Sequence, residues 1–202
     1  MGCQKLTSIG LPEKFQSHEE VVRIDAVNAF SADFYDLLSY RTIDDQIHID
    51  HCDRDARGVV IPNEIDGFPV TSISGDAFSN CSSLTSITVD SRNELYKSVD
   101  GVVFSKDASQ LLICPRGKSG GYTVPDTAAS IGGNAFAYCE SLTSITISES
   151  VTSIGLSAFC FCKKLTVITI PDSVTSIGDY AFMGCSSLIS VTIPDGVTSI
   201  GL

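Results

Sequence analysis

The chain has 202 residues, of which 43% are hydrophobic and 18% charged, and its formal net charge at pH 7 is −11. That hydrophobic content can bury a core, but no apolar run approaches the roughly 18 residues of a membrane-spanning helix, so we expect no membrane span. The acidic balance argues against nucleic acid as a partner, because a phosphate backbone would be repelled.

The N-terminal segment contains part of a unit that recurs later in the chain. Met1–Ile9 aligns with Met183–Val191, so residues 1–12 are predicted to form a partial repeat. Residues 13–40 lose this register. Ser17 and Glu20 have the spacing of a capping box, which predicts an irregular connector with a short helix through Ala29. Because the chain begins and ends within a repeat, we expect a piece of a longer array whose uncapped ends can self-associate.

The next two segments resemble an entry structure followed by a first full repeat. Around Asp44-Asp45, apolar residues alternate on both sides, which predicts a hairpin-like cap over residues 41–60. Residues 61–90 carry an Ala-Phe pair at 77–78 and Cys81, both features of the later repeats. Five extra residues, Ile65–Pro69, interrupt this copy.

Residues 91–121 break the repeat and are predicted to form a β-hairpin insertion. Apolar residues concentrate in segments 96–104 and 111–117, and the polar turn between them would run from Ser105 to Ser109.

Residues 122–202 form an uninterrupted array with a period of 23 residues. The sequence Val-Thr-Ser-Ile-Gly recurs at 151–155, 174–178 and 197–201. In each unit a short alternating stretch such as Ser144–Ile147 predicts a strand with one buried face, and an Ala-Phe pair predicts a corner. One unit cannot bury enough surface to fold alone, so the units must stack. We predict a β-rich repeat solenoid with turns of 23 residues.

These residues carry a family resemblance. The pattern resembles the BspA-like leucine-rich repeat over residues 122–202, and it returns at residues 61–89. The resemblance implies a leucine-rich-repeat-like solenoid and a cell-surface or secreted protein, since the family includes microbial adhesins that bind host matrix proteins or other cells. The pattern reads Cys162-x-x-Leu165-x-x-Ile168-x-Ile170-Pro171-x-x-Val174-x-x-Ile177-Gly178-x-x-Ala181-Phe182.

Most of the eight cysteines follow the repeat. Those at 3, 81, 139, 162 and 185 occupy one inward slot, which predicts a ladder of small buried hydrophobic side chains rather than disulfides. Cys160 lies in a different slot, and we expect it to be the most exposed thiol.

One segment has the density of ligating side chains that a metal site needs. It contains His48, His51, Cys52, Asp53 and Asp55. Its spacing fits no standard metal-binding loop, and strand alternation would instead make it a solvated hairpin edge. We therefore expect no metal, no cofactor and no enzyme, with a metal-dependent enzyme using His48 and His51 as the remote alternative.

The repeats also create a flat surface of stacked hydroxyl side chains. Such a face can bind proteins or glycans without a deep pocket. The leading hypothesis is a non-catalytic protein- or glycan-binding module of a larger microbial surface protein of the adhesin type. The alternative is a purely structural spacer within an envelope protein. The candidate binding residues are Ser86, Thr88, Ser144, Thr146, Thr169, Ser190 and Thr192.

Overall fold

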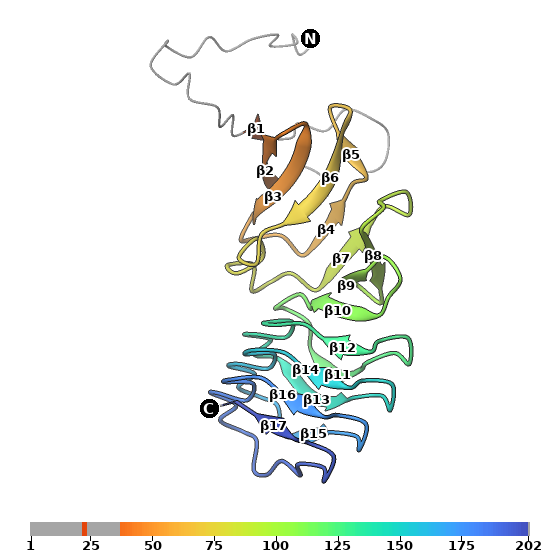
Figure 1. Cartoon of the computed structure of the whole chain (residues 1–202). Helices are drawn as coiled ribbons and strands as arrows, with labels where there is room; N and C mark the ends of the chain where they lie inside the picture. The colour runs from red at the N-terminus through yellow and green to blue at the C-terminus, as the bar shows by residue number, and fades with distance from the viewer. Residues whose placement is uncertain (1–21, 24–36, 202) are drawn as a thin grey trace.

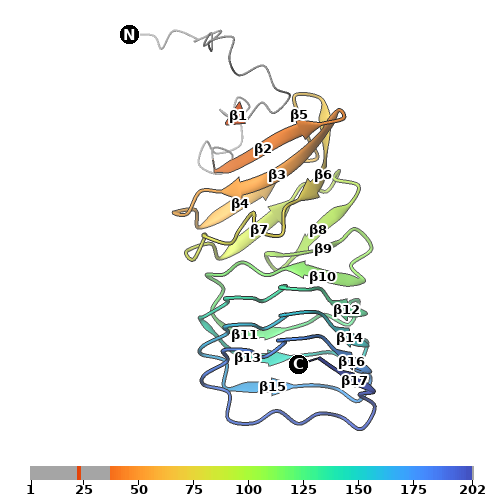
Figure 2. The same cartoon turned by 60° about the vertical axis from the view of Figure 1, so that its left-hand side comes forward.

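The computed structural model describes residues 22–23 and 37–201, and all the regular structure within these ranges is β-strand. The strands are short and stack along one axis, so the molecule is elongated (Figures 1 and 2). Each turn of the coil contributes two short strands, and equivalent strands of successive turns lie side by side. The predicted β-rich solenoid is therefore confirmed.

The first strands cap one end of the stack. β1 (Val22–Arg23) pairs antiparallel with β2 (Leu38–Ile43), which pairs with β3 (Gln46–Cys52) around a tight turn. Asp44 and Asp45 both have positive φ in this turn, 51° and 58°, as a two-residue hairpin with the twist of its strands requires. The helix predicted through residue 29 is wrong at Val22–Arg23, where strand pairing satisfies the backbone instead. The partial repeat at residues 1–12 lies outside the described residues.

β3 also begins the stack, because it pairs in parallel with β6 (Phe68–Ile73). The extra residues of this turn fold back locally: β5 (Glu64–Ile65) pairs antiparallel with β6 around Asp66 and Gly67, both at positive φ. The insertion therefore leaves the path of the coil unchanged.

The two strands of each turn form two parallel columns. The first column continues through the Ser-Ile dipeptides, which align rung by rung, with Ile131 opposite Ile154 and Ile154 opposite Ile177. The second column contains the Ile-x-Ile segments, with Ile145 opposite Ile168. Its strands fall into two separate sheets, β4–β7 and β11–β13–β15. The bounds in the first column are β12 Ser130–Ile131, β14 Ser153–Ile154, β16 Ser176–Ile177 and β17 Ser199–Ile200; those in the second are β4 Gly58–Ile61, β7 Ser86–Val89, β11 Gly120–Thr123, β13 Leu142–Thr146 and β15 Val167–Thr169.

Three antiparallel strands join the two parts of the stack, which are the N-terminal part from β2 to β7 and the C-terminal part from β11 to β17. β8 (Tyr96–Val99) pairs with β9 (Val102–Ser105), which pairs with β10 (Gln110–Ile113). β10 then pairs in parallel with β12, so it is itself a rung of the first column. The segment predicted as an insertion thus contributes one of its strands to the solenoid.

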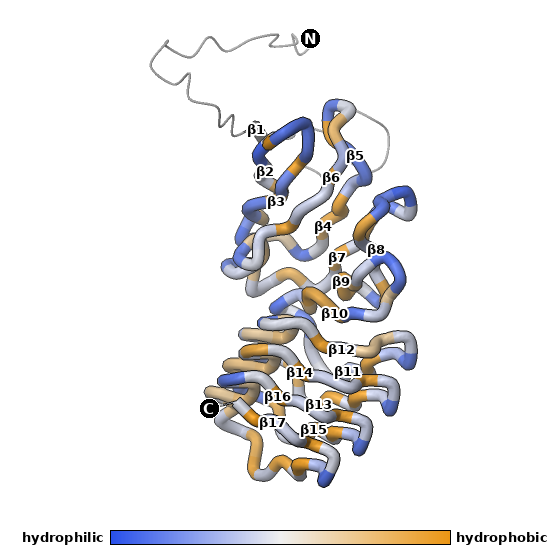
Figure 3. The backbone as a smooth tube through the Cα atoms, viewed as in Figure 1, coloured by the Kyte–Doolittle hydropathy of each residue, from blue (hydrophilic) through white to orange (hydrophobic). Residues whose placement is uncertain are grey.

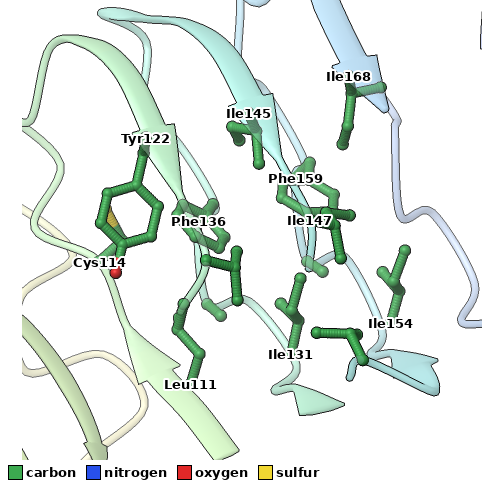
Figure 4. Close-up of a cluster of buried hydrophobic side chains, with 14 of the residues drawn as sticks. Leu111, Cys114, Tyr122, Ile131, Phe136, Ile145, Ile147, Ile154, Phe159 and Ile168 are labelled. Carbon is green, nitrogen blue, oxygen red and sulfur yellow. The ribbon is translucent and has the colours of Figure 1, made fainter. Parts of the chain in front are cut away.

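The core consists of two clusters of inward side chains, one within residues 38–103 and the other within residues 102–181. Alternate residues of every rung point inward, and the corner phenylalanines stack between them (Figure 4). Hydrophobic residues recur along each rung, whereas the turn tips on the right of Figure 3 are hydrophilic. Phe136 and Phe159 are fully buried.

The cysteine ladder lies in this core. Cys81, Cys139 and Cys162 are fully buried, and each thiol donates a hydrogen bond to a backbone carbonyl of the preceding turn. The prediction that Cys160 is the most exposed thiol is wrong: it is 4% exposed, and Cys185 is the least buried cysteine among the described ones. Cys160 is enclosed because Ala137 and Met183 lie in the same slot of the turns on either side.

Candidate functional site

The candidate site is the outward side of the second column, which we call the strand face (β4, β7, β11, β13 and β15). Strand alternation places isoleucines inside and hydroxyl side chains outside: Ile145 and Ile168 are buried, whereas Thr146 and Thr169 are exposed. Parallel pairing joins β11 to β13 and β13 to β15, so the backbone groups between these three strands are satisfied.

The register aligns three threonines into one row. Thr123 lies opposite Thr146, and Thr146 lies opposite Thr169. All three are exposed, and we call them the threonine row. In the neighbouring position Ser144 lies opposite Val167, whose side chain is 57% exposed. Thr123 was missed as a candidate from the sequence, although it precedes Thr146 by one 23-residue period.

The candidates at 86 and 88 do not join this row. They lie on β7, which pairs only with β4 in its sheet. The turn between β8 and β9 lies along the other edge of β7, where the N–H of Ile87 donates to the carbonyl of Gly101 at 2.9 Å. A Cβ at Gly101 would lie 2.6 Å from the Oγ of Ser86, so only glycine permits this approach. The hydroxyl surface is therefore divided into two parts.

The last two candidates lie on the outermost turn. Ser190 and Thr192 are exposed, but residues 189–193 have no strand pairing in the part of the chain that is described. Leu188 and Val191 are only partly buried because no further turn in the described chain packs against them.

The candidate metal ligands do not form a metal site. His51, Cys52, Asp53 and Asp55 line one shallow hollow, but within residues 37–201 no three His, Cys, Asp or Glu side chains are placed to hold an ion together. Strand alternation is the reason. Cys52 points into the core, where burial raises the pKa of its thiol, whereas His51 is exposed and its Nδ1 lies 2.9 Å from the carbonyl of Asp50.

The other polar groups of this hairpin are also engaged locally. The Oδ1 of Asp53 accepts a hydrogen bond from the N–H of Asp55 at 2.8 Å, which closes a tight turn. Asp50 receives two hydrogen bonds from Arg41, at 2.6 and 3.0 Å. The prediction of a hairpin edge is wrong, because β3 pairs with β2 on one side and with β6 on the other.

The strand face can form hydrogen bonds through its serine and threonine hydroxyls, and its other outward residues on these strands are glycine and valine. Over β4 and β7 the face has a shallow groove that includes Arg57, Val60 and Thr88.

The repeat defines the family. The sequence profile of the BspA type leucine rich repeat region matches residues 57–111 and 120–202, in six copies. The chain belongs to the BspA-type leucine-rich repeat family. The resemblance drawn from the 23-residue pattern is confirmed, and the match includes the segment at 91–111 that interrupts the regular repeat.

Two solved structures of bacterial proteins are similar to this BspA-type chain. The pneumococcal vaccine antigen PcpA shares 30% sequence identity over 72% of this chain and 35% of that one, with a TM-score of 0.65. A leucine-rich cell surface protein from Faecalibacterium prausnitzii A2-165 shares 32% identity over 76% of this chain and 40% of that one, with a TM-score of 0.63. The chain therefore spans less than half the length of either protein. A search of curated proteins finds no match.

One of these two similar proteins is named a cell surface protein, and this agrees with the location that the family resemblance leads us to expect. Within residues 22–23 and 37–201, no helix has the length and apolar character that crossing a membrane requires.

Proposed function

We propose that the chain is a non-catalytic binding module of a larger bacterial surface protein, and that its strand face contacts a protein or glycan partner. The observation that carries this proposal is the threonine row, which presents three exposed hydroxyls in register on a rigid sheet. Each hydroxyl both donates and accepts a hydrogen bond, so the row can pair with peptide groups or sugar hydroxyls.

The rigidity of the sheet favours binding by such a modest surface. Neighbouring strands lie about 4.8 Å apart, so the row offers polar groups at a fixed repeat. Because the backbone is already ordered, arranging these polar groups on binding costs little conformational entropy. The exposed side chain of Val167 lies beside the row and adds apolar contact. The family and the named cell surface relative support a location at which such contacts are useful.

A pair of matched variants tests the strand face. The first changes Thr123, Thr146 and Thr169 to Glu. The second changes Thr152, Thr175 and Thr198 to Glu; these are also exposed threonines at 23-residue spacing, but they lie outside the strand face, next to the first column. Both variants add three negative charges to stacked turns, so repulsion between the new side chains is matched. Thermal unfolding of both shows whether each retains the fold.

The binding measurement uses purified chain on a glycan array and on immobilised fibronectin, fibrinogen, laminin and collagen. We expect the wild type and the second variant to bind the same probe, and the first variant to lose at least tenfold in affinity. Equal binding by both variants would refute a role for the strand face. Absence of binding by the wild type to every probe would favour the structural spacer.

A further inference from the structure

A second candidate binding site lies where the two parts of the stack meet, on the side of the corners (left edge of Figure 1). Successive corners are joined by hydrogen bonds along the stack. The N–H groups of residues 134, 136 and 138 donate to the carbonyls of 156, 158 and 160 at 2.8, 2.8 and 2.7 Å. The N–H groups of residues 157, 159 and 161 donate to those of 179, 181 and 183 at 2.8, 2.9 and 2.7 Å. The N–H groups of each corner thus satisfy the carbonyl groups of the next corner.

One turn is too short to continue this pattern. Leu111 pairs with Ile131 and Gly120 pairs with Leu142, so residues 112–119 cover the path that residues 132–141 cover in the next turn. The N–H of Cys114 donates to the carbonyl of Ala135 at 2.7 Å, which aligns Cys114 with Phe136. Residues 112–113 therefore correspond to residues 132–135 of the next turn, and the two missing residues precede Cys114. We call residues 132–135 the projection of that turn.

The missing projection leaves a notch and open backbone groups. One wall contains Asp76, Phe78 and Ser79, the other contains Asn134, Ala137 and Tyr138, and the cleft between them measures about 420 Å³. That volume lies within the range of small ligand sites. The carbonyls of Gly133 and Ala137 accept no hydrogen bond from the described part of the chain, and the N–H of Phe78 donates none. In the regular turns the equivalent groups are paired.

An arginine spans the notch at one end. Arg116 lies in the slot that Tyr138 and Phe161 occupy in later turns; it donates to the carbonyl of Ser79, and its guanidinium lies 4.5 Å from the centre of the Tyr138 ring. Within residues 37–201 no carboxylate lies within 4.0 Å of this guanidinium, although the chain is strongly acidic. A half-buried guanidinium in this position is suited to a carboxylate, which it can bind through two hydrogen bonds.

We propose that this notch binds an acidic peptide segment of a partner protein. The peptide backbone takes the place of the missing projection, donating to the carbonyl of Gly133, and an Asp or Glu side chain pairs with Arg116. A peptide fits better than a sugar because the open donor of Phe78 lies on one wall and the open acceptor of Gly133 on the other, as a further layer of backbone requires. The site is on a different side of the molecule from the strand face and is independent of the function proposed for that face.

Selection from a random heptapeptide phage library tests the proposal, followed by affinity measurements with the selected peptide in synthetic form. We expect the selected peptides to share an Asp or Glu. Arg116→Gln should weaken binding at least tenfold, whereas Arg92→Gln, which removes the same charge from an exposed arginine, should leave it unchanged. Inserting Gly-Asn before Cys114 restores the missing projection and should abolish binding.

Three results would overturn the proposal: no peptide selected, peptides without an acidic residue, or full binding to the insertion variant. Binding of acidic glycans from an array without any peptide binding would also overturn it. If the insertion prevents folding, N-methylation of the selected peptide provides the decisive measurement. It removes the amide donors and should weaken binding, whereas undiminished binding would contradict the assigned backbone contacts.

Discussion

Phe136 and Phe159 stack in successive turns, with ring centroids 5.2 Å apart and an interplanar angle of 21°. Phe159 in turn stacks on Phe182 at 5.5 Å, so one aromatic column runs through the corners. Because each ring contacts the turns above and below it, the column couples neighbours directly, as the stability of a solenoid requires.

Removing the middle ring should therefore weaken two interfaces together. We expect Phe159→Ala to lower the free energy of unfolding by about 3–5 kcal/mol, the usual cost of a large cavity in a packed core. Urea denaturation measures this loss. Tyr180→Ala is the control, because that side chain is 54% exposed. A loss below 1 kcal/mol for Phe159→Ala would show that the column is not coupled.

Asn93 joins β6 to the β8–β9–β10 segment and should be essential for their packing. Its Nδ2 donates to the carbonyls of Pro62 and Val70, both at 3.2 Å, and its Oδ1 accepts from the N–H groups of Leu95 and Tyr96. We expect Asn93→Leu to cost about 2–4 kcal/mol, because buried backbone groups lose their partners. The exposed substitution Asn80→Ala should change stability by less than about 0.5 kcal/mol in the same denaturation experiment.

The buried thiols should make the fold sensitive to alkali. Burial raises the pKa of Cys52 and Cys81, and hydrogen bonding to Cys114 together with burial raises that of Cys139. The folded chain holds these protons where the unfolded chain, with thiol pKa values near about 8.5, releases them. Stability is therefore fully present below this pH and falls as the pH rises above it. Unfolding free energies constant from pH 7 to 10.5 would contradict this.

Alkylation should distinguish the thiols individually. The interaction with Cys162 lowers the pKa of the Cys185 thiol, and Cys185 is also the least buried of the described cysteines. With iodoacetamide at pH 8, mass spectrometry should show Cys185 modified first and Cys160 and Cys162 protected until unfolding. Modification of Cys160 at the rate of Cys185 would show that its slot is open to solvent.

Acid should loosen the turn between β9 and β10. Hydrogen bonds from Ser105 and Ser109 lower the pKa of Asp107 to about 2. Because this pKa is depressed, the contribution of the carboxylate is present above its unfolded pKa of about 3.9 and is lost as the pH falls through about 2. An NMR titration of the Asp107 carboxyl carbon measures the pKa, and Asp107→Ala should remove the pH dependence of the neighbouring amides. A midpoint near 4 would contradict the hydrogen bonding.

Repetition explains what could be predicted from the sequence. The alternation at Ser144–Ile147 and the inward slot of Cys139 recur every 23 residues, and each copy of a repeat reports the same environment. Features that occur only once in the sequence provide less information about the structure. The strand at Val22–Arg23 depends on pairing with residues far along the chain, and the burial of Cys160 depends on Ala137 and Met183 in adjacent turns.

The candidate surfaces illustrate the same difference. The outward position of Thr146 and Thr169 follows from alternation, but the interruption at Ser86 results from the approach of Gly101 in a turn outside the repeat. The notch beside Arg116 has no local signature, because it arises from two residues that are absent relative to the next turn.

The central claim is that a partner contacts the strand face, and methyl NMR tests it most directly. The chain is labelled at threonine and valine methyl groups and titrated with the protein or glycan that binds in the screen. We predict shifts at Thr123, Thr146, Val167 and Thr169, with Thr152, Thr175 and Thr198 unchanged. Shifts confined to Thr152, Thr175 and Thr198 would place the partner elsewhere and contradict the account.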